Sequence, residues 1–136
     1  MNIKMAITTL FAGMLFFGSA AGSFAADLYL IAHSGVTLTA AEAREVFLGT
    51  KQFSGPIKLV PVDNAAAQEE FLNKVIKLDS AKYSTSWTKK SFRDGLIPPA
   101  VKSGDVEVIE FVKRAPGAVG YVGSSPRNVN VIQYTE

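Results

Sequence analysis

The sequence has no cysteine and only one histidine, and these two shortages remove several kinds of chemistry. Without cysteine the chain has no disulfide, no thiolate metal site and no cysteine nucleophile. It also lacks the lipid-attachment cysteine of an exported bacterial lipoprotein. A single histidine, His33, leaves little material for a catalytic triad or a histidine metal site. Gly-x-Ser-x-Gly, His-Glu-x-x-His and P-loop motifs are missing too, so we expect no enzyme, no cofactor and no metal.

Strong net charge is also missing, because 14 basic residues face 12 acidic ones. The basic residues are spread along the chain, and the densest group, Lys89, Lys90 and Arg93, is typical of a solvated helix face. This pattern lacks the cluster of basic residues that binds the phosphates of nucleic acid, so we expect no nucleic-acid partner. With 136 residues, 48% of them hydrophobic, the chain suits one packed domain.

The N-terminus has the pattern of a secretory signal peptide. Lys4 gives a short positive start, an apolar stretch follows, and Ser23-Phe24-Ala25 fits the small-x-small rule for cleavage. The apolar run is shorter than the roughly 20 residues of a membrane span. We expect residues 1–25 to be a cleaved signal peptide and residues 26–136 to be the working domain, although a cut after Ala26 also fits.

Alternating apolar runs and helix caps predict an α/β domain. Strands are expected at 28–32, 57–62, 118–122 and 130–134. Helices are expected after the capping box Thr39-x-x-Glu42, from Asp63 or Asn64 to about Ile76, from Asp79 or Ser80 to Gly95, and from Ser103 or Asp105 to Pro116-Gly117. This order predicts a mixed, mostly parallel sheet flanked by helices.

Three stretches carry a resemblance to a known family: Leu38-Thr39 with Val46-Phe47-Leu48-Gly49, the segment from Leu59 to Phe71, and the segment from Ala115 to Val122, which reads APGAVGYV. Their order and spacing resemble the type 2 periplasmic substrate-binding proteins of phosphate ABC transporters, over roughly residues 27–125. Receptors of that family close two lobes over the anion, and this chain resembles one lobe only. The resemblance implies a stand-alone periplasmic lobe with its ligand at the carboxyl ends of the strands.

The phosphate signature of that family is an arginine followed by Asp-Gly-Ser-Gly-Thr at the start of a helix. Here Asp63 matches the aspartate, but the serine and threonine fall on Ala65 and Ala67, and the arginine falls on Val60 or Pro61. Hydroxyl and guanidinium donors, each worth about 1–3 kcal/mol, are therefore lost. The backbone N–H groups of Ala65 and Ala66 are expected to remain as donors.

Two short segments supply the candidate ligand-binding residues, which are His33, Ser34, Gly35, Asp63, Asn64, Ala65 and Ala66. The loop at His33–Gly35 follows the first strand, and the turn at Asp63–Ala66 follows the second. Each segment also has a plain structural interpretation, as a loop before a helix and as a helix cap. Tyr83 and Trp87, four residues apart, are expected to be core rather than a ligand platform.

Two functions stay open at this point. The first is a non-enzymatic solute-binding module with weak or altered anion binding, its partners a small anion such as phosphate and an ABC permease. The second is a periplasmic protein-interaction or regulatory module that has lost the solute site, with another periplasmic protein or a second copy as its partner. The alanines at 65–67 favour the second, because they remove donors where an anion would bind.

Overall fold

The computed structural model describes residues 27–135, so the predicted signal peptide lies outside the described residues. The strands are β1 (Leu28–Ala32), β2 (Phe53–Ser54), β3 (Ile57–Lys58), β4 (Val60–Asn64), β5 (Ala100–Lys102), β6 (Ala118–Val122) and β7 (Asn130–Thr135). The helices are α2 (Ala40–Phe47), α3 (Gln68–Phe71), the π-helical turn η1 (Leu72–Ile76), α4 (Ser80–Asp94) and α5 (Asp105–Arg114). Among the described residues, no helix has the length and apolar character needed to span a membrane.

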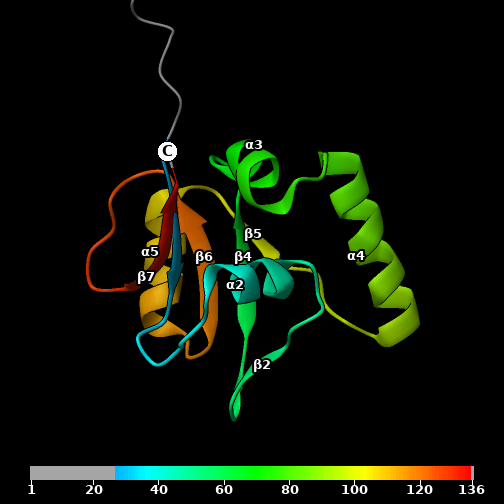
Figure 1. The fold of residues 1–136 in the computed structure, drawn as a ribbon, viewed down its shortest axis with the longest axis horizontal. Coiled ribbons are helices and arrows are strands. Elements are labelled where there is room, and N and C mark those ends of the chain that lie inside the picture. The colour runs from blue at the N-terminus through cyan, green and yellow to red at the C-terminus, as the bar shows by residue number, and fades with distance from the viewer. Residues whose placement is uncertain (1–26, 136) are drawn as a thin grey trace, which may run out of the picture.

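A five-stranded sheet in the order β5-β4-β6-β1-β7 forms the centre of the molecule (Figure 1). β4 pairs in parallel with both β5 and β6, whereas β1 pairs antiparallel with β6 and β7. Four strands therefore run in one direction and β1 runs against them. This confirms the predicted mixed, mostly parallel sheet of an α/β fold.

Helices cover both faces of the sheet because alternate residues of each strand point to opposite sides. On one face, Leu30 and Tyr121 join the core under α2, α3 and α4. On the other face, Ile31 and Val122 pack with α5. Gly120 has no side chain on that second face, and an added Cβ would come within 2.8 Å of Val108 Cγ1, so α5 can pack close to β6.

Several local predictions are confirmed by the helix ends. Thr39 and Glu42 form the reciprocal capping box that starts α2. The Asp79 carboxylate accepts from Lys82 N at the start of α4, and Gly95 ends that helix in a left-handed conformation. Trp87 is buried in the core, as its spacing from Tyr83 predicted.

Other local predictions were wrong. The segment 57–62 is not one strand, because a hairpin of β2 and β3 turns at Gly55 before β4 begins at Val60. Asp63 and Asn64 do not cap a helix; they are the last residues of β4, and α3 starts only at Gln68 with no side-chain cap. The edge strand β5 was not predicted, because it has only three residues and directly follows Pro98 and Pro99, a pair typical of a loop.

Helix α4 stands at the β5 side of the sheet (Figure 1), and three of its side chains donate hydrogen bonds to residues outside the helix. Tyr83 donates its hydroxyl to Asp63, Trp87 Nε1 donates to the Phe47 carbonyl at 3.0 Å, and Ser91 Oγ donates to the Leu96 carbonyl at 2.7 Å. Tyr83 and Trp87 thus join the helix to β4 and α2, whereas the Ser91 bond ties the end of the helix to the loop that follows it.

Candidate functional site

The carboxyl end of β4, where sequence reasoning placed the ligand, holds a buried carboxylate. Asp63 is 2% exposed, and its Oδ1 accepts from the Tyr121 hydroxyl at 2.7 Å. Its Oδ2 accepts from the Tyr83 hydroxyl at 3.1 Å. Burial raises the pKa of Asp63, and hydrogen bonds from both tyrosines and Gln68 oppose that rise. Burial and the nearby carboxylate also raise the pKa of both tyrosines, so their hydroxyls stay protonated and donate.

The neighbouring residue, Asn64, is fully buried and ties three elements together. Its Nδ2 donates to Tyr121 O at 3.0 Å and to Asp105 Oδ1 at 2.8 Å. Asp105, at the start of α5, also accepts from Gly123 N and from Ser124 Oγ. Burial pushes the pKa of Asp105 upward, but the bonds from Ser124, Asn64 and the backbone of Gly123 outweigh it and lower the pKa. Both polar residues of the turn thus serve the fold.

The backbone donors expected at this turn are not free, and that prediction was wrong. Ala65 N donates to Lys102 O at 2.9 Å, and Ala66 N donates to Asn64 Oδ1 at 3.0 Å. Ala67 N donates to Asn64 O at 3.0 Å. Asn64 closes the turn with its own side chain, as asparagine commonly does. An anion arriving here would find these donors occupied and two carboxylates, Asp63 and Asp105, nearby.

The second predicted segment, His33–Gly35, lies at the other end of the sheet. His33 N donates to Ala118 O, and Ala118 is paired with Val60 at the start of β4. Asp63 is three residues, or about 10 Å, further along the strand. The two segments are separated because β1 runs antiparallel to its neighbours. The structure therefore does not bring the seven predicted site residues together.

The loop at His33–Gly35 is held by internal bonds. His33 is half-buried, and its Nδ1 accepts from Gly35 N at 3.3 Å. Asn130 Nδ2, on β7, donates to Ser34 O at 3.1 Å. No group of three or more metal-ligating side chains is found among residues 27–135. The arrangement of this loop is that of a braced connection between β1 and α2.

A polar cavity of about 310 Å³ lies beneath the first half of α4. Asp63, Gln68, Ser80, Ser84 and Thr88 supply its polar lining, and Tyr83, Trp87, Pro98, Pro99 and Val101 complete it. Its one charged lining residue is a carboxylate. Such a cavity offers no positive charge to an anion.

A larger and mostly apolar groove of about 460 Å³ lies at the amino end of β4. We call it the β4 groove. Its apolar lining residues are Val46, Leu59, Val60, Pro61, Val62, Trp87, Leu96, Ile97, Pro98, Ala100 and Phe111. The groove exists because β5 pairs only with Val62–Asn64, so the first half of β4 has no neighbour on that side. Trp87 and Pro98 line both this groove and the polar cavity.

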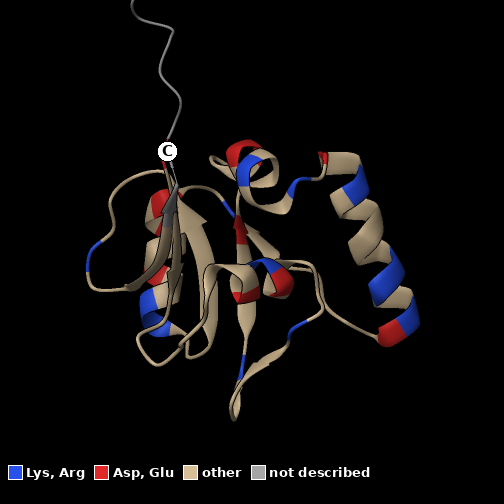
Figure 2. Cartoon of the chain, viewed as in Figure 1, with Lys and Arg blue, Asp and Glu red and all other residues tan. Residues whose placement is uncertain are grey.

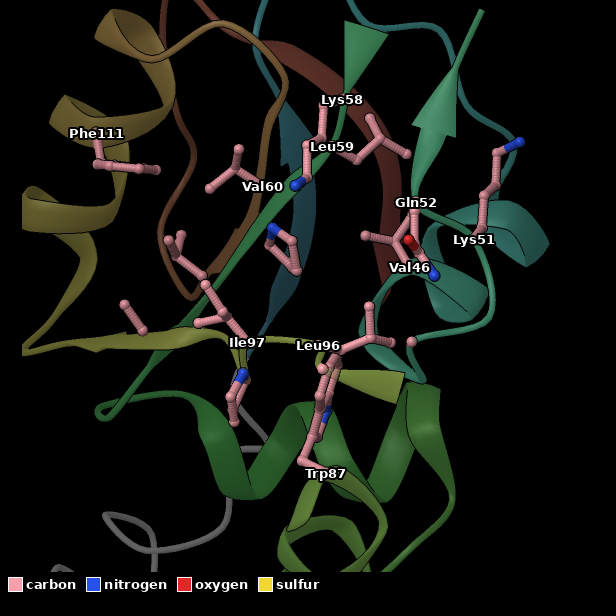
Figure 3. Close-up of a pocket in the computed structure, with 16 residues that line it drawn as sticks. Val46, Lys51, Gln52, Lys58, Leu59, Val60, Trp87, Leu96, Ile97 and Phe111 are labelled. Atoms are coloured by element: carbon pink, nitrogen blue, oxygen red, sulfur yellow. The ribbon is translucent and has the colours of Figure 1, made fainter. Parts of the chain in front are cut away.

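Figure 3 shows how the β4 groove is framed. Trp87, Leu96 and Ile97 form one wall, and the start of β4 forms the facing wall. Its charged lining residues are Lys51 and Lys58, both basic. The volume falls in the usual range for small-molecule sites, about 300–1,000 Å³, which are typically apolar with a few polar groups.

Sequence reasoning missed this groove. Trp87 was correctly predicted to be core, yet its ring also lines the groove. The available signal was the pair Leu96-Ile97 between Gly95 and two prolines, an apolar pair outside any helix or strand. Ile97 is 85% exposed, which is unusual for an isoleucine.

No known protein-family model matches the sequence, and no curated protein matches it. Among solved structures, the chain is similar to an ABC-type phosphate transport receptor from Vibrio cholerae, with a TM-score of 0.49 and 16% sequence identity. The match covers 79% of this chain and 46% of the receptor, so the chain spans less than half the length of the protein that it matches.

Proposed function

We propose that this chain is a non-enzymatic, exported binding module that takes a small ligand with an apolar body in the β4 groove. The observation that carries the proposal is the groove itself, about 460 Å³ in volume and lined mostly by apolar side chains. The leader-like N-terminus supports export, and the family resemblance supports a periplasmic solute-binding role. The groove lies at the amino end of β4, away from the turn that carries the anion signature in that family.

The chemistry of the alternative sites supports this choice over inorganic phosphate. The β4–α3 turn has its backbone donors at Ala65, Ala66 and Ala67 already bonded. The polar cavity contains the Asp63 carboxylate, which would repel an anion. Figure 2 shows lysine and arginine scattered over several elements instead of gathered at the carboxyl end of β4. The carboxyl end of β4 therefore offers few free donors and little positive charge to a phosphate site of the family type.

Trp87 makes the proposal simple to test, because it is the sole tryptophan of the chain and lines the groove. The mature protein would be titrated with a neutral apolar probe, N-phenyl-1-naphthylamine, while tryptophan emission and energy transfer to the probe are recorded. We expect saturable binding. Inorganic phosphate at millimolar concentration, followed by calorimetry, should produce no heat of binding.

A matched pair of variants locates the binding. Val60→Phe adds a ring inside the groove, whereas Val131→Phe adds the same ring on β7, at the far edge of the sheet. The two valines are 37% and 48% exposed, so both variants should fold. Probe affinity should fall at least tenfold in Val60→Phe and stay unchanged in Val131→Phe. Equal affinity in both variants, or no saturable binding to the parent protein, would contradict the proposal.

The second candidate, a protein-interaction module, is favoured by one separate observation. Phe92 and Ile97 are 89% and 85% exposed and lie close in sequence around the end of α4. Exposed aromatic and aliphatic side chains of this kind commonly anchor protein partners. Sedimentation of the parent protein and of Phe92→Ser tests this: a dimer that is lost in the variant supports self-association, and a strict monomer that captures no periplasmic protein contradicts the candidate.

A further inference from the structure

We propose that the ligand of the β4 groove is a small amphipathic anion, whose apolar body lies against Trp87 and Ile97 and whose negative group is met by Lys58. This inference rests on the proposed function, because it names the chemistry of a ligand for the same groove. Its support comes from the charges at the groove, the way Lys58 is held, and the shape of the strand edge.

The charged residues that line the groove are both basic. Lys51 and Lys58 are its charged lining residues, and no aspartate or glutamate lines it. Lys51 is already engaged, because its Nζ lies 3.6 Å from Glu42 Oε2. Lys58 makes no salt bridge within the described part of the chain. An uncompensated ammonium group beside apolar walls is complementary to a carboxylate on an apolar body.

The backbone around Lys58 is fixed on both sides, which positions the side chain. Leu59 N donates to Gln52 O at 2.9 Å, and Val60 N donates to Gly117 O at 2.8 Å. Gly117 approaches Lys58 so closely that an added Cβ would collide with the Lys58 carbonyl. Figure 3 shows the Lys58 side chain extending toward the middle of the groove, while Lys51 points away from it. A fixed backbone beneath a flexible amine suits recognition of a ligand at the groove entrance.

The edge of β4 favours a small amphiphile over an extended peptide. Val60 donates its N–H to Gly117 O, beside β6. Because successive backbone N–H groups of a strand point to opposite edges, the backbone nitrogen of Pro61 faces the open edge of β4. Proline has no N–H to donate, and prolines are a common means of blocking strand addition at an edge. Pro98 and Pro99 on the facing segment likewise have no N–H to donate. The occupant must therefore be recognised through its apolar surface and its charge.

Decanoate and decanol separate the two parts of the inference, because they share a chain and differ in charge. Decanoate would be titrated below its micellar concentration and decanol below its solubility limit, both against the Trp87 emission of the mature protein, with inorganic phosphate as the third arm. We expect decanoate to bind at least about five times more tightly than decanol. Added salt should weaken decanoate and leave decanol unchanged.

Lys58→Met keeps the length of the side chain and removes its charge, and Lys58→Arg keeps the charge. Lys113→Met, on the exposed side of α5, is the control for a change in net charge. Decanoate affinity should fall about fivefold in Lys58→Met, stay near the parent value in Lys58→Arg and Lys113→Met, and decanol affinity should not change.

Three outcomes are distinguishable. Equal binding of decanol and decanoate, with no effect of Lys58→Met, overturns this inference and leaves the apolar groove as a binding site. Binding of neither ligand, together with no binding of the neutral naphthylamine probe, overturns the proposed function itself. Binding of inorganic phosphate that competes with decanoate would show that Lys58 recognises the charge alone, and this also contradicts the inference.

Discussion

The two ends of β4 differ in how their polar groups are used. At the carboxyl end, Asp63 and Asn64 are buried, and every hydrogen bond described there runs to another part of the same chain. At the amino end, Val60 and Pro61 line an open groove, and Lys58 beside them has no acidic partner in the described residues. Open α/β sheets usually bind ligands at the carboxyl ends of their strands.

This contrast shows how a turn at the end of a strand can use its donors for internal bonds and so have none left for a ligand. A turn that presents hydroxyl and backbone donors to an anion must leave those donors unpaired inside the protein. When Asn64 and Ala65–Ala67 bond internally, the same region becomes a fixed junction between β4, β6 and α5. The open surface lies instead at the other end of the strand, where the sheet is incomplete.

The largest expected effect comes from Asn64→Leu, which breaks the internal bonds at the carboxyl end of β4. We call this end of the strand the closed end. The substitution keeps a similar side-chain size but removes the bonds to Tyr121 O, Asp105 and Ala66 N. Each buried group left without a partner costs about 1–3 kcal/mol, so we expect the free energy of unfolding to fall by about 3–5 kcal/mol. Chemical denaturation at neutral pH measures the loss.

Asn73→Ala is the control for that measurement, because Asn73 is exposed on η1. Its effect should stay within about 0.5 kcal/mol. If Asn64→Leu were equally mild, the carboxyl end would not be the fixed junction described above, and its donors would be available to a ligand after all.

A smaller loss is expected at the amino end from Gly117→Ala. Gly117 has φ +83°, and an added Cβ would collide with the Lys58 carbonyl. The left-handed conformation and the forced shift of β3 together should cost about 2–4 kcal/mol in unfolding free energy. Decanoate binding should also weaken, because Lys58 moves.

Gly55→Ala separates these two costs. Gly55 has φ +59°, and nothing lies within 4 Å of an added Cβ, so it bears the conformational cost without the collision. We expect Gly117→Ala to be more destabilising than Gly55→Ala by about 1 kcal/mol or more. Equal losses would mean that the contact with Lys58 does not constrain the groove.

Much of the fold could be predicted from local patterns in the sequence. The capping box at Thr39, the cap at Asp79 and the stop at Gly95 are short-range features, and the structure has all three. The strand at Ala118–Val122 followed from its apolar run. These signals depend on neighbouring residues only, which is why the sequence was sufficient for them.

The site could not be predicted in the same way, because it depends on strand direction and on distant partners. Nothing local indicates that β1 runs against β6, which moves His33 to the end opposite Asp63. Asp63 has the residue type of a helix cap, but two tyrosines 20 and 58 residues away draw its carboxylate into the core. The β4 groove likewise depends on where β5 stops pairing.

Asp63→Asn tests the closed end through pH. Burial raises the folded-state pKa of Asp63, so between its ordinary value of 3.8 and that raised pKa the folded chain holds a proton that the unfolded chain has lost. The contribution of Asp63 to the free energy of unfolding is therefore fully present below pH 3.8. It is lost as the pH rises, at up to about 1.4 kcal/mol per pH unit. Asparagine does not titrate.

The measurement is the unfolding free energy of both proteins from pH 3.5 to 7. The stability of Asp63→Asn relative to the parent should increase as the pH rises, and the comparison cancels carboxylates with the opposite slope, such as Asp105. A relative stability that is flat with pH would mean that Asp63 is solvated, and the closed end would then be open to ligands.

The smallest effect is expected from Lys58→Met on stability without ligand. Lys58 is exposed and makes no salt bridge in the described residues, so the change in unfolding free energy should be within about 0.5 kcal/mol. Denaturation of the ligand-free protein measures it, with Lys113→Met alongside. A loss above 1 kcal/mol would give Lys58 a structural role in the hairpin. Its positive charge would then belong to the fold, as the charges at the other end of β4 do, and the contrast between the two ends would fail.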